Sequence, residues 1–308
     1  MNDRLDQAES IINLAWEAWF ASRLRQATRE IVKLLPDLEK TLYTSLANFS
    51  ILRVKELLIR CHGLLGTICL DALQNDHALF HYIQAYQLAE DMQDTSLSVT
   101  YLALIGDVLR RQNDKTGALS RMELARDQAV KAKGVTSATR GHILQLLAYT
   151  YGDTGNEAEF ERSIAEATDL LAHTGEGRDI AKEEFIPFEI YEIRGKVYRD
   201  LGKPLEAIPY LELAEASLDN TEGVTPRFHA LVQISRGQAL CDAGDLTNGV
   251  DVVIRGFLMA YRCHSPRQMN RVRKLFRKLE SGSFKDYPQV AHLKEVVYET
   301  YLRMDLER

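Results

Sequence analysis

Three small residues at a fixed spacing recur along this chain, and they constrain its fold more than any other feature. Between residues 188 and 219, Gly195, Ala207 and Ala214 lie on two apolar stripes with helical spacing. Residues 201–204 interrupt the stripes with a glycine and a proline, which commonly end and begin helices. Antiparallel helices joined by a short turn approach most closely where side chains are small. The stretch therefore predicts one helical hairpin.

The same spacing of small residues recurs in other segments of the chain. Three segments keep a small residue at all three places: Gly66, Ala78 and Ala85; Gly106, Ala118 and Ala125; and Gly237, Gly249 and Gly256. A degenerate copy has Ala148, Phe160 and Ala167, and Ala15 with Ala27 begins a divergent one. Several sets at the same offsets favour a repeated hairpin over an unrelated helical bundle, which is the alternative.

This pattern resembles the tetratricopeptide repeat, in which small residues occupy repeat positions 8, 20 and 27. The resemblance implies an all-α, right-handed solenoid of about six helical hairpins plus a C-terminal helix pair. The first small residues recur every 40 to 47 residues, whereas the ordinary unit has about 34 residues. Extra residues lengthen the helices by about one turn, a form that resembles the repeats of bacterial transcription regulators and kinesin light chains.

We expect a single continuous solenoid with a cap at each end. Residues 1–45 would form a divergent N-terminal hairpin, residues 46–263 five long-helix repeats, and residues 264–308 the C-terminal capping helices. In the first hairpin, Trp16 and Trp19 lie on a wide apolar face. Pro36 is expected to kink or end the second helix, because a proline inside a helix removes a backbone hydrogen bond.

The N-terminal segment also resembles the unit that follows the DNA-binding domain in bacterial helix-turn-helix regulators of the XRE type. The matching features are the tryptophan pair, an arginine-rich turn, and the run Leu34-Leu35-Pro36 followed by Leu38. The resemblance implies a regulatory sensor region. No helix-turn-helix domain precedes it, so we expect either an isolated sensor module or a relative that lost its reader. The tryptophans also fit a purely structural role, covering the open end of the solenoid.

Composition and charge narrow the classes of protein. A net charge of −6 argues against wholesale nucleic-acid binding and permits a local basic patch. The first ten residues are charged and lack an apolar signal core, and no run reaches the length of a membrane span. We therefore expect a cytoplasmic protein with no membrane partner. The four cysteines form no CxxC pair and fit reduced, half-buried core residues.

Two clusters have residue types that can bind phosphates or a metal. The basic run from Arg267 to Lys278 could contact phosphates, but no groove-reading motif accompanies it. We expect a solvated helix face and no direct nucleic-acid binding. His77 and His81 have the i, i+4 spacing that can bind a metal, but no third ligand follows at a telling spacing. We therefore expect no metal site.

Nothing in the chain requires an enzyme. Glu192 and Lys196 are candidate acid and base residues, but a pair at i, i+4 on a helix is usually a surface salt bridge. The glycine-rich segments lack the lysine and serine or threonine of a phosphate-binding loop. We therefore expect no catalytic residues and no cofactor.

A ligand of such a solenoid would lie on the first helices of successive hairpins, which line its concave surface. In the repeat family, positions 2, 5, 9 and 12 point into that groove. The matching residues here are mostly polar. They are Arg60, Thr67, Thr100, Asp107, Arg110, His142, Gln145, Tyr149, Glu189, Glu192, Lys196, Arg199 and Gln238. Such side chains suit a peptide, whose backbone amides need partners, although a plain hydrated groove would have the same composition.

The sequence thus favours an interaction module, most plausibly a regulatory sensor that binds a peptide or a protein in its groove. The alternative is a structural adaptor or a dimerising scaffold that acts through its end caps, so a homo-oligomer stays open. A sensor predicts that Arg110→Ala or Tyr149→Ala abolishes ligand binding without loss of stability. An adaptor predicts that the ends of the chain matter more than the groove.

Overall fold

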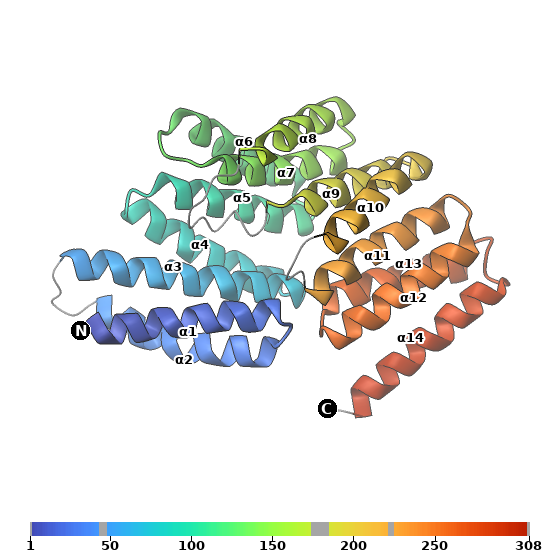
Figure 1. The fold of residues 1–308 in the computed structure, drawn as a ribbon, viewed down its shortest axis with the longest axis horizontal. Coiled ribbons are helices and arrows are strands. Elements are labelled where there is room, and N and C mark those ends of the chain that lie inside the picture. The colour runs from blue at the N-terminus through green and yellow to red at the C-terminus, as the bar shows by residue number, and fades with distance from the viewer. Residues whose placement is uncertain (1, 43–47, 174–184, 221–224, 307–308) are drawn as a thin grey trace. The chain divides into compact units, whose positions relative to one another are not determined.

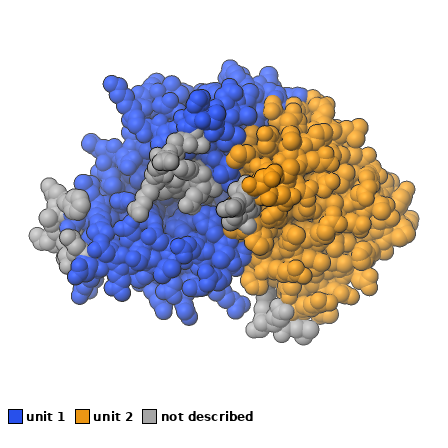
Figure 2. Space-filling model, viewed as in Figure 1, with its two compact units in different colours: residues 1–186 blue, residues 187–308 orange. Residues whose placement is uncertain are grey.

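All regular structure in the described part of the chain is helical. The computed structural model describes residues 2–42, 48–173, 185–220 and 225–306 (Figure 1). Residues 1–186 and 187–308 form two compact units, drawn in two colours in Figure 2. Among the described residues, no helix is long and apolar enough to cross a membrane.

The first unit contains four helical hairpins. Each helix packs against the next along the chain, and α1 also contacts α3, as α5 does α7. The helices are α1 (Asn2–Phe20), α2 (Leu24–Leu42), α3 (Asn48–Asp71), α4 (Asn75–Asp91), α5 (Thr95–Arg111), α6 (Lys115–Lys131), α7 (Ser137–Asp153) and α8 (Glu157–Leu171).

The second unit contains two further hairpins and a terminal helix pair. Here α9 packs on α10 and α11, and α12 packs on α11, α13 and α14. The helices are α9 (Pro187–Asp200), α10 (Pro204–Asp219), α11 (Pro226–Asp242), α12 (Leu246–Arg262), α13 (Pro266–Ser281) and α14 (Pro288–Leu306). The predicted hairpins are thus present, whereas the continuity of one solenoid through both units stays a prediction.

In the hairpins that have it, the recurring glycine lies where the second helix crosses the first. A Cβ added to Gly66 would lie 2.4 Å from Cε1 of Tyr82, and one added to Gly195 would lie 2.5 Å from Cγ of Leu211. The same holds for Gly106 against Met122. The facing residue is in each case repeat position 24. The small residue is therefore required by the distance between the two helices.

The degenerate repeat accommodates its large residue inside the α7–α8 hairpin. Phe160 is fully buried, as are Ile164 and Ala167 on the same face of α8. A phenylalanine at the usual alanine place therefore joins the core.

Short turns join the two helices of most hairpins, and their residues match the backbone that a turn requires. Asp114 caps α6 by accepting a hydrogen bond from the backbone N–H of Gly117 at 2.9 Å. Asn113 before it has a φ of 68° and Gly202 has a φ of 80°, in the left-handed region that asparagine and glycine tolerate best. Side-chain caps also start α5, α7, α8, α12 and α13.

The N-terminal hairpin shares an apolar core with α3 of the next hairpin. Trp19 is buried and Trp16 packs against it at 6.0 Å between ring centroids. Pro36 does not end the second helix, because α2 continues to Leu42. Pro36 and Val32 are both exposed, so water can satisfy the Val32 carbonyl that loses its helical partner.

Candidate ligand-binding surface

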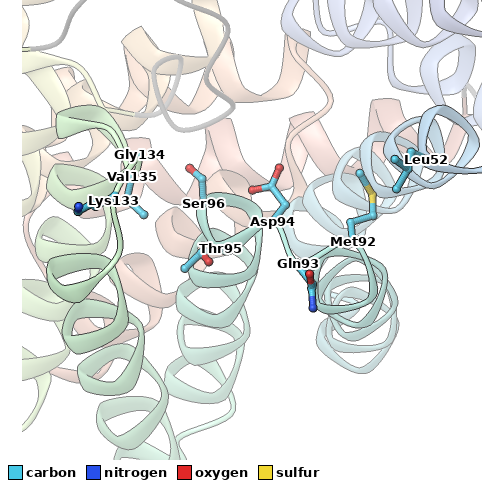
Figure 3. Close-up of a pocket in the computed structure, with 9 residues that line it drawn as sticks. All are labelled: Leu52, Met92, Gln93, Asp94, Thr95, Ser96, Lys133, Gly134 and Val135. Atoms are coloured by element: carbon cyan, nitrogen blue, oxygen red, sulfur yellow. The ribbon is translucent and has the colours of Figure 1, made fainter. Parts of the chain in front are cut away.

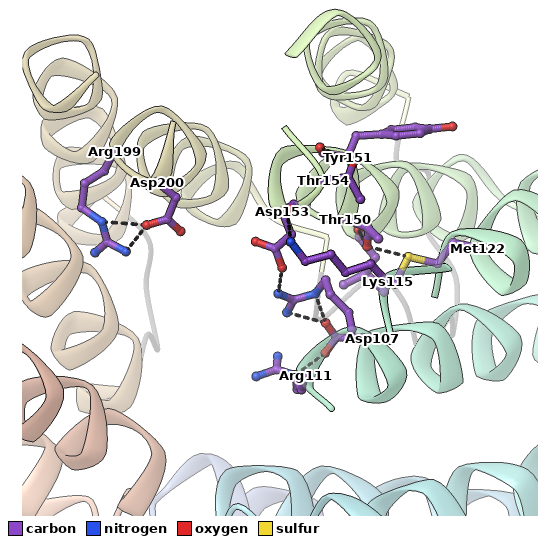
Figure 4. Close-up of polar contacts among 12 residues, drawn as sticks. Asp107, Arg111, Lys115, Met122, Thr150, Tyr151, Asp153, Thr154, Arg199 and Asp200 are labelled. Carbon is purple, nitrogen blue, oxygen red and sulfur yellow. Dashed lines mark hydrogen bonds and ion pairs between the residues drawn. The ribbon is translucent and has the colours of Figure 1, made fainter. Parts of the chain in front are cut away.

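Arg110, on α5, is held between carboxylates from two helices. Its Nη2 donates to Oδ1 of Asp107 at 2.7 Å, and its Nη1 donates to Oδ2 of Asp153 on α7 at 2.8 Å. Asp107 also accepts a hydrogen bond from Nε of Arg111 at 2.7 Å. Figure 4 shows these contacts. The result is a cluster of two arginines and two aspartates that joins the first helices of two successive hairpins.

Tyr149 completes this cluster from α7. The guanidinium carbon of Arg110 lies 3.8 Å from the centroid of the Tyr149 ring, a cation–π contact. The side chains of Arg110 and Asp107 are only 7% and 4% exposed. Burial lowers the pKa of Arg110, and Asp107 and Asp153 raise it, with a net upward direction. Arg110 therefore stays charged, and its position is fixed before any ligand arrives.

The other predicted residues of the first unit lie on the same first helices. Thr100 on α5 is buried and donates to the carbonyl of Ser96 at 2.8 Å. His142 and Gln145 on α7 are buried and lie 3.0 Å apart between Nδ1 and Nε2. Together with Asp107, Arg110 and Tyr149, these side chains form a polar row along two helices in contact, which we call the α5–α7 face.

Two predicted residues lie on α3, in the preceding hairpin. The Arg60 side chain is 20% exposed, and its guanidinium donates to Oδ1 of Asn13 at 2.5 Å and lies 3.5 Å from Glu9. Thr67 donates to the carbonyl of Gly63 and lies 3.1 Å from the hydroxyl of Tyr82. Of the two predicted arginines in this unit, Arg60 is therefore more exposed to solvent than Arg110.

The second unit has a polar cluster of its own between α9, α11 and α13. The Ser235 hydroxyl donates to Oε1 of Glu192 at 2.5 Å and accepts from Nη2 of Arg271 at 2.7 Å. Gln238 accepts from Arg199 at 2.5 Å and from Arg271 at 2.9 Å. Glu192 is buried, so this candidate acid lies in a contact between helices.

Glu189 and Lys196 are half-buried on α9, on the same helix as Glu192. All thirteen predicted residues therefore lie on the first helices of their hairpins. Contact between any of them and a ligand stays a prediction.

Most of these side chains serve as interhelix contacts, which the repeat positions alone did not reveal. The sequence reasoning omitted Arg111, Asp153, Ser235 and Arg271, which bond to the predicted residues. The sequence contained one signal for such partners: two consecutive arginines on a helix, Arg110 and Arg111, indicate that acidic side chains lie nearby. Because Arg110 and Tyr149 are buried, we expect Arg110→Ala and Tyr149→Ala to lower stability as well, which corrects the expectation of unchanged stability.

The basic helix α13 is partly neutralised within its own unit. Lys278 donates to Oδ1 of Asp242 on α11 at 2.6 Å, and Arg271 donates hydrogen bonds to Ser235 and Gln238. Arg273, Lys274 and Arg277 are exposed. This arrangement fits a solvated helix face next to an acidic neighbour.

Histidines of two helices form a close pair elsewhere in the first unit. Nδ1 of His62 on α3 lies 2.9 Å from Nδ1 of His81 on α4. Burial, and then His81, lowers the pKa of His62 to about 4. Burial, and then His77, lowers the pKa of His81. In the described ranges, no group of three or more His, Cys, Asp or Glu side chains is arranged to hold a metal ion.

An open pocket of about 380 Å³ lies at the start of α5 (Figure 3). It contains none of the predicted ligand residues. Its lining comes from the connections before α5 and α7, from the first two residues of α5 and from one residue of α3: Leu52, Met92, Gln93, Asp94, Thr95, Ser96, Lys133, Gly134 and Val135. Asp94 is engaged in capping α5, with 3.0 Å to the backbone N–H of Leu97, so the pocket presents mainly loop surface.

Comparison with known families identifies one of the repeats. Residues 188–216 match the model of the tetratricopeptide repeat. This segment contains Gly195, Ala207 and Ala214, the set from which the other copies were found. No curated protein matches the chain.

Solved structures with the same arrangement of helices match over most of the chain. A Rap protein complexed with competence and sporulation factor has a TM-score of 0.58 at 14% identity, covering 99% of this chain and 100% of that one. BtubC from P. vanneervenii has a TM-score of 0.53 at 17% identity, covering 77% and 91%.

A third similar structure is a signal transduction ATPase with numerous domains from Pyrococcus horikoshii, which carries a tetratricopeptide repeat sensor. Its TM-score is 0.55 at 14% identity, and the match covers 91% of this chain and 41% of that larger one. At these identities the similarity concerns the fold. The predicted all-α, tetratricopeptide-like solenoid fold is confirmed.

Proposed function

We propose that this chain is an interaction module that binds a peptide or an extended segment of a protein along the first helices of its hairpins. One observation carries the proposal: the α5–α7 face brings together polar side chains from two helices in contact, with Arg110 fixed between Asp107, Asp153 and Tyr149. A peptide backbone needs hydrogen-bonding partners of both kinds, and pre-ordered side chains lower the entropy cost of binding.

Two of the similar structures support this function. One is a Rap protein in complex with competence and sporulation factor, and the other is a protein with a tetratricopeptide repeat sensor. We further propose a regulatory sensor role. Helices α5 and α7 belong to different hairpins, so a ligand that contacts both would favour one angle between the hairpins. Its binding energy would shift the equilibrium between hairpin orientations toward that angle.

The experiment is a selection of peptides on the intact chain, followed by mapping of the site. Peptides from a random display library would be selected on the wild type, and hydrogen exchange would then be measured with and without the tightest peptide. We expect new protection in α5 and α7. Failure to select any peptide, or protection confined to helices outside α3, α5, α7, α9 and α11, would overturn the proposal.

A matched pair of variants sharpens the mapping. Arg111→Ala removes a side chain at the edge of the face that is 19% exposed and paired with Asp107. Arg126→Ala removes an arginine that is 29% exposed and paired with Asp127 on α6. The first variant should weaken peptide binding by about tenfold, whereas the second should leave it unchanged. Equal effects would place the peptide elsewhere.

The alternative role as an adaptor that acts through its ends is favoured by α14. Tyr298 and Leu302 are 61% and 63% exposed one turn apart on this terminal helix. Sedimentation of the wild type and of Leu302→Ser would test this role. A wild-type dimer that dissociates in the variant would support a scaffold, and a monomer at all concentrations would exclude self-association through α14.

A further inference from the structure

The outward side of α10 carries an apolar stripe. Its inward residues Ala207, Leu211, Ala214 and Leu218 are buried against α9 and α11. On the opposite side Leu205 is 73% exposed and Leu213 is 48% exposed. Pro209 and Ala216 are also exposed, and around the helix axis both lie at angles between those of Leu205 and Leu213. At about 100° per residue, these four fall within an arc of about 80°. We call this stripe the α10 outer face.

Acidic residues border the stripe on both sides. Glu212 and Asp219 lie along one edge and Glu206 along the other, and all three are exposed. Helix α10 contains no lysine, arginine or histidine. Glu212 lies 3.5 Å from Arg236 of α11 and Asp219 lies 3.9 Å from His229, while Glu206 makes no ion pair with any residue that the structure describes. The border is therefore negatively charged.

No other second helix of the hairpins combines these two features in the described ranges. Helix α2 has Val32 as its one exposed large apolar residue and α4 has Phe80, while α8 and α12 have none. Helix α6 exposes Leu124 and Val130, but it mixes four basic residues with its acidic ones. The α10 outer face is thus unlike the general surface of the repeat, where scattered apolar residues need no explanation.

We propose that the α10 outer face docks an amphipathic helix of a partner protein, with large apolar residues three and four positions apart and lysine or arginine on either side. Leu205 and Leu213 would provide the apolar anchors, at a separation that spans about two helical turns. The basic residues of the partner would pair with Glu206, Glu212 and Asp219. This pairing would select basic helices over acidic ones and raise the association rate. The α5–α7 face plays no part in this contact.

Charge and packing exclude the basic helix of this chain as that partner. Helix α13 has basic residues on one side, but its apolar residues Val272, Leu275, Phe276 and Leu279 are buried in its own unit. Its exposed face could offer charges and no apolar anchors. Helix α13 is therefore not the docked helix, and a second copy of this chain is an outcome that the test below distinguishes.

The test uses two synthetic helical peptides of about four turns, with identical leucine stripes and either lysine or glutamate at the flanking positions. Each would be labelled and titrated with the full chain by fluorescence anisotropy. We expect the lysine peptide to bind the wild type at least about tenfold more tightly than the glutamate peptide. Equal affinity for the two peptides, or no binding of the lysine peptide, would overturn the proposal.

Surface variants locate the contact and keep the fold. Leu205→Ser with Leu213→Ser should weaken binding of the lysine peptide by about tenfold, and Glu206→Lys with Glu212→Lys should reverse the preference. The matched control is Leu124→Ser with Val130→Ser on α6, which removes apolar side chains that are 44% and 64% exposed and should change nothing. All variants change exposed residues, and circular dichroism would verify their helix content.

Two outcomes would decide against α10. Equal loss in the α6 control would show nonspecific apolar binding and overturn the proposal. A wild-type dimer in sedimentation that Leu205→Ser with Leu213→Ser dissociates would also overturn it, because the face would then bind a second copy of this chain.

Discussion

Arg110 on α5 and Asp153 on α7 are 43 residues apart in the sequence, yet their side chains form an ion pair of 2.8 Å. The pair joins the first helices of two successive hairpins. The same surface that suits a ligand therefore also holds neighbouring repeats together. Substitutions on this face report on binding only when stability is measured alongside.

Asp107→Ala should be strongly destabilising, because it leaves Arg110 with one carboxylate and Arg111 with none from this cluster. Breaking a buried ion pair typically costs about 3–5 kcal/mol. The shift in the urea midpoint would measure the loss. The control is Asp127→Ala, whose carboxylate is 53% exposed and pairs with Arg126. That change should cost less than about 1 kcal/mol, and equal effects would show that the cluster adds no stability.

Gly66→Ala should destabilise the second hairpin. The new Cβ would lie 2.4 Å and 2.6 Å from two ring carbons of Tyr82, which is itself buried. Overpacking of this kind costs about 1–3 kcal/mol, although alanine recovers part of it through its helix propensity. Thermal unfolding of the single variants and of the double variant with Tyr82→Leu would measure the coupling. Additive effects would contradict the proposed clash.

Stability should fall with pH through the titration of His62. Its folded pKa is about 4, below the value of about 6.5 in an unfolded chain. Between these pH values the unfolded state binds the proton more tightly, so lowering the pH through this window destabilises the fold. The full contribution is present above about pH 6.5 and amounts to about 3 kcal/mol at most.

The variant His62→Gln isolates this contribution, because glutamine can still hydrogen-bond to His81 but does not titrate. Denaturation midpoints at about pH 7.5 and about pH 4.5 should differ less for the variant than for the wild type. The same difference in both proteins would exclude His62 as the origin. His81 has a lowered pKa as well, so His81→Gln should show the same direction.

The thiols of Cys61 and Cys241 should resist alkylation in the folded protein. Burial raises the pKa of each to about 12, and the thiolate is the reactive form. Mass spectrometry after iodoacetamide treatment should find both unmodified in buffer and modified in urea. Cys69 is half-buried with a raised pKa, and it should react at an intermediate rate. Rapid labelling of Cys61 without denaturant would contradict its burial.

Ser235→Ala should destabilise the second unit. The fully buried hydroxyl bonds to both Glu192 and Arg271, and its loss removes two contacts to charged groups at once. We expect a cost of about 1–3 kcal/mol, measured as the change in the urea midpoint. Ser120→Ala, at an exposed position of α6, is the control that should stay near zero.

The hairpins could be predicted because their cause is local in sequence. Gly195 and Ala207 mark the place where two consecutive helices touch, and Leu201 to Pro204 marks the turn between them. The distance between helices dictates a small residue there, so the spacing recurs wherever the contact does. Of the two outcomes expected at Pro36, an end of the helix is wrong, because α2 continues to Leu42. The exposure of Pro36 and Val32, which lets water bond to the freed carbonyl, is a property of the packed structure.

The sequence predicted on which helices the candidate site residues lie, but not which side chains they contact. Repeat numbering placed Asp107, Arg110 and Tyr149 on first helices, as the structure has them. Nothing in the order of residues indicated that Asp153 would bond to Arg110, or that Ser235 would bond to Glu192. Those partners come from other hairpins, and how far one hairpin is rotated against the next depends on all the side chains between them.

The sequence by itself determined the helical hairpins, since a glycine at the crossing of two helices and a turn after it are requirements of local geometry. Tertiary structure alone decided which side chains, polar or apolar, are buried by the fold and which stay exposed. Arg110 is buried between two carboxylates, whereas Leu205 of α10 is 73% exposed. Burial depends on which helix packs over a residue, and that packing minimises exposed apolar area and unpaired charge for the whole unit at once.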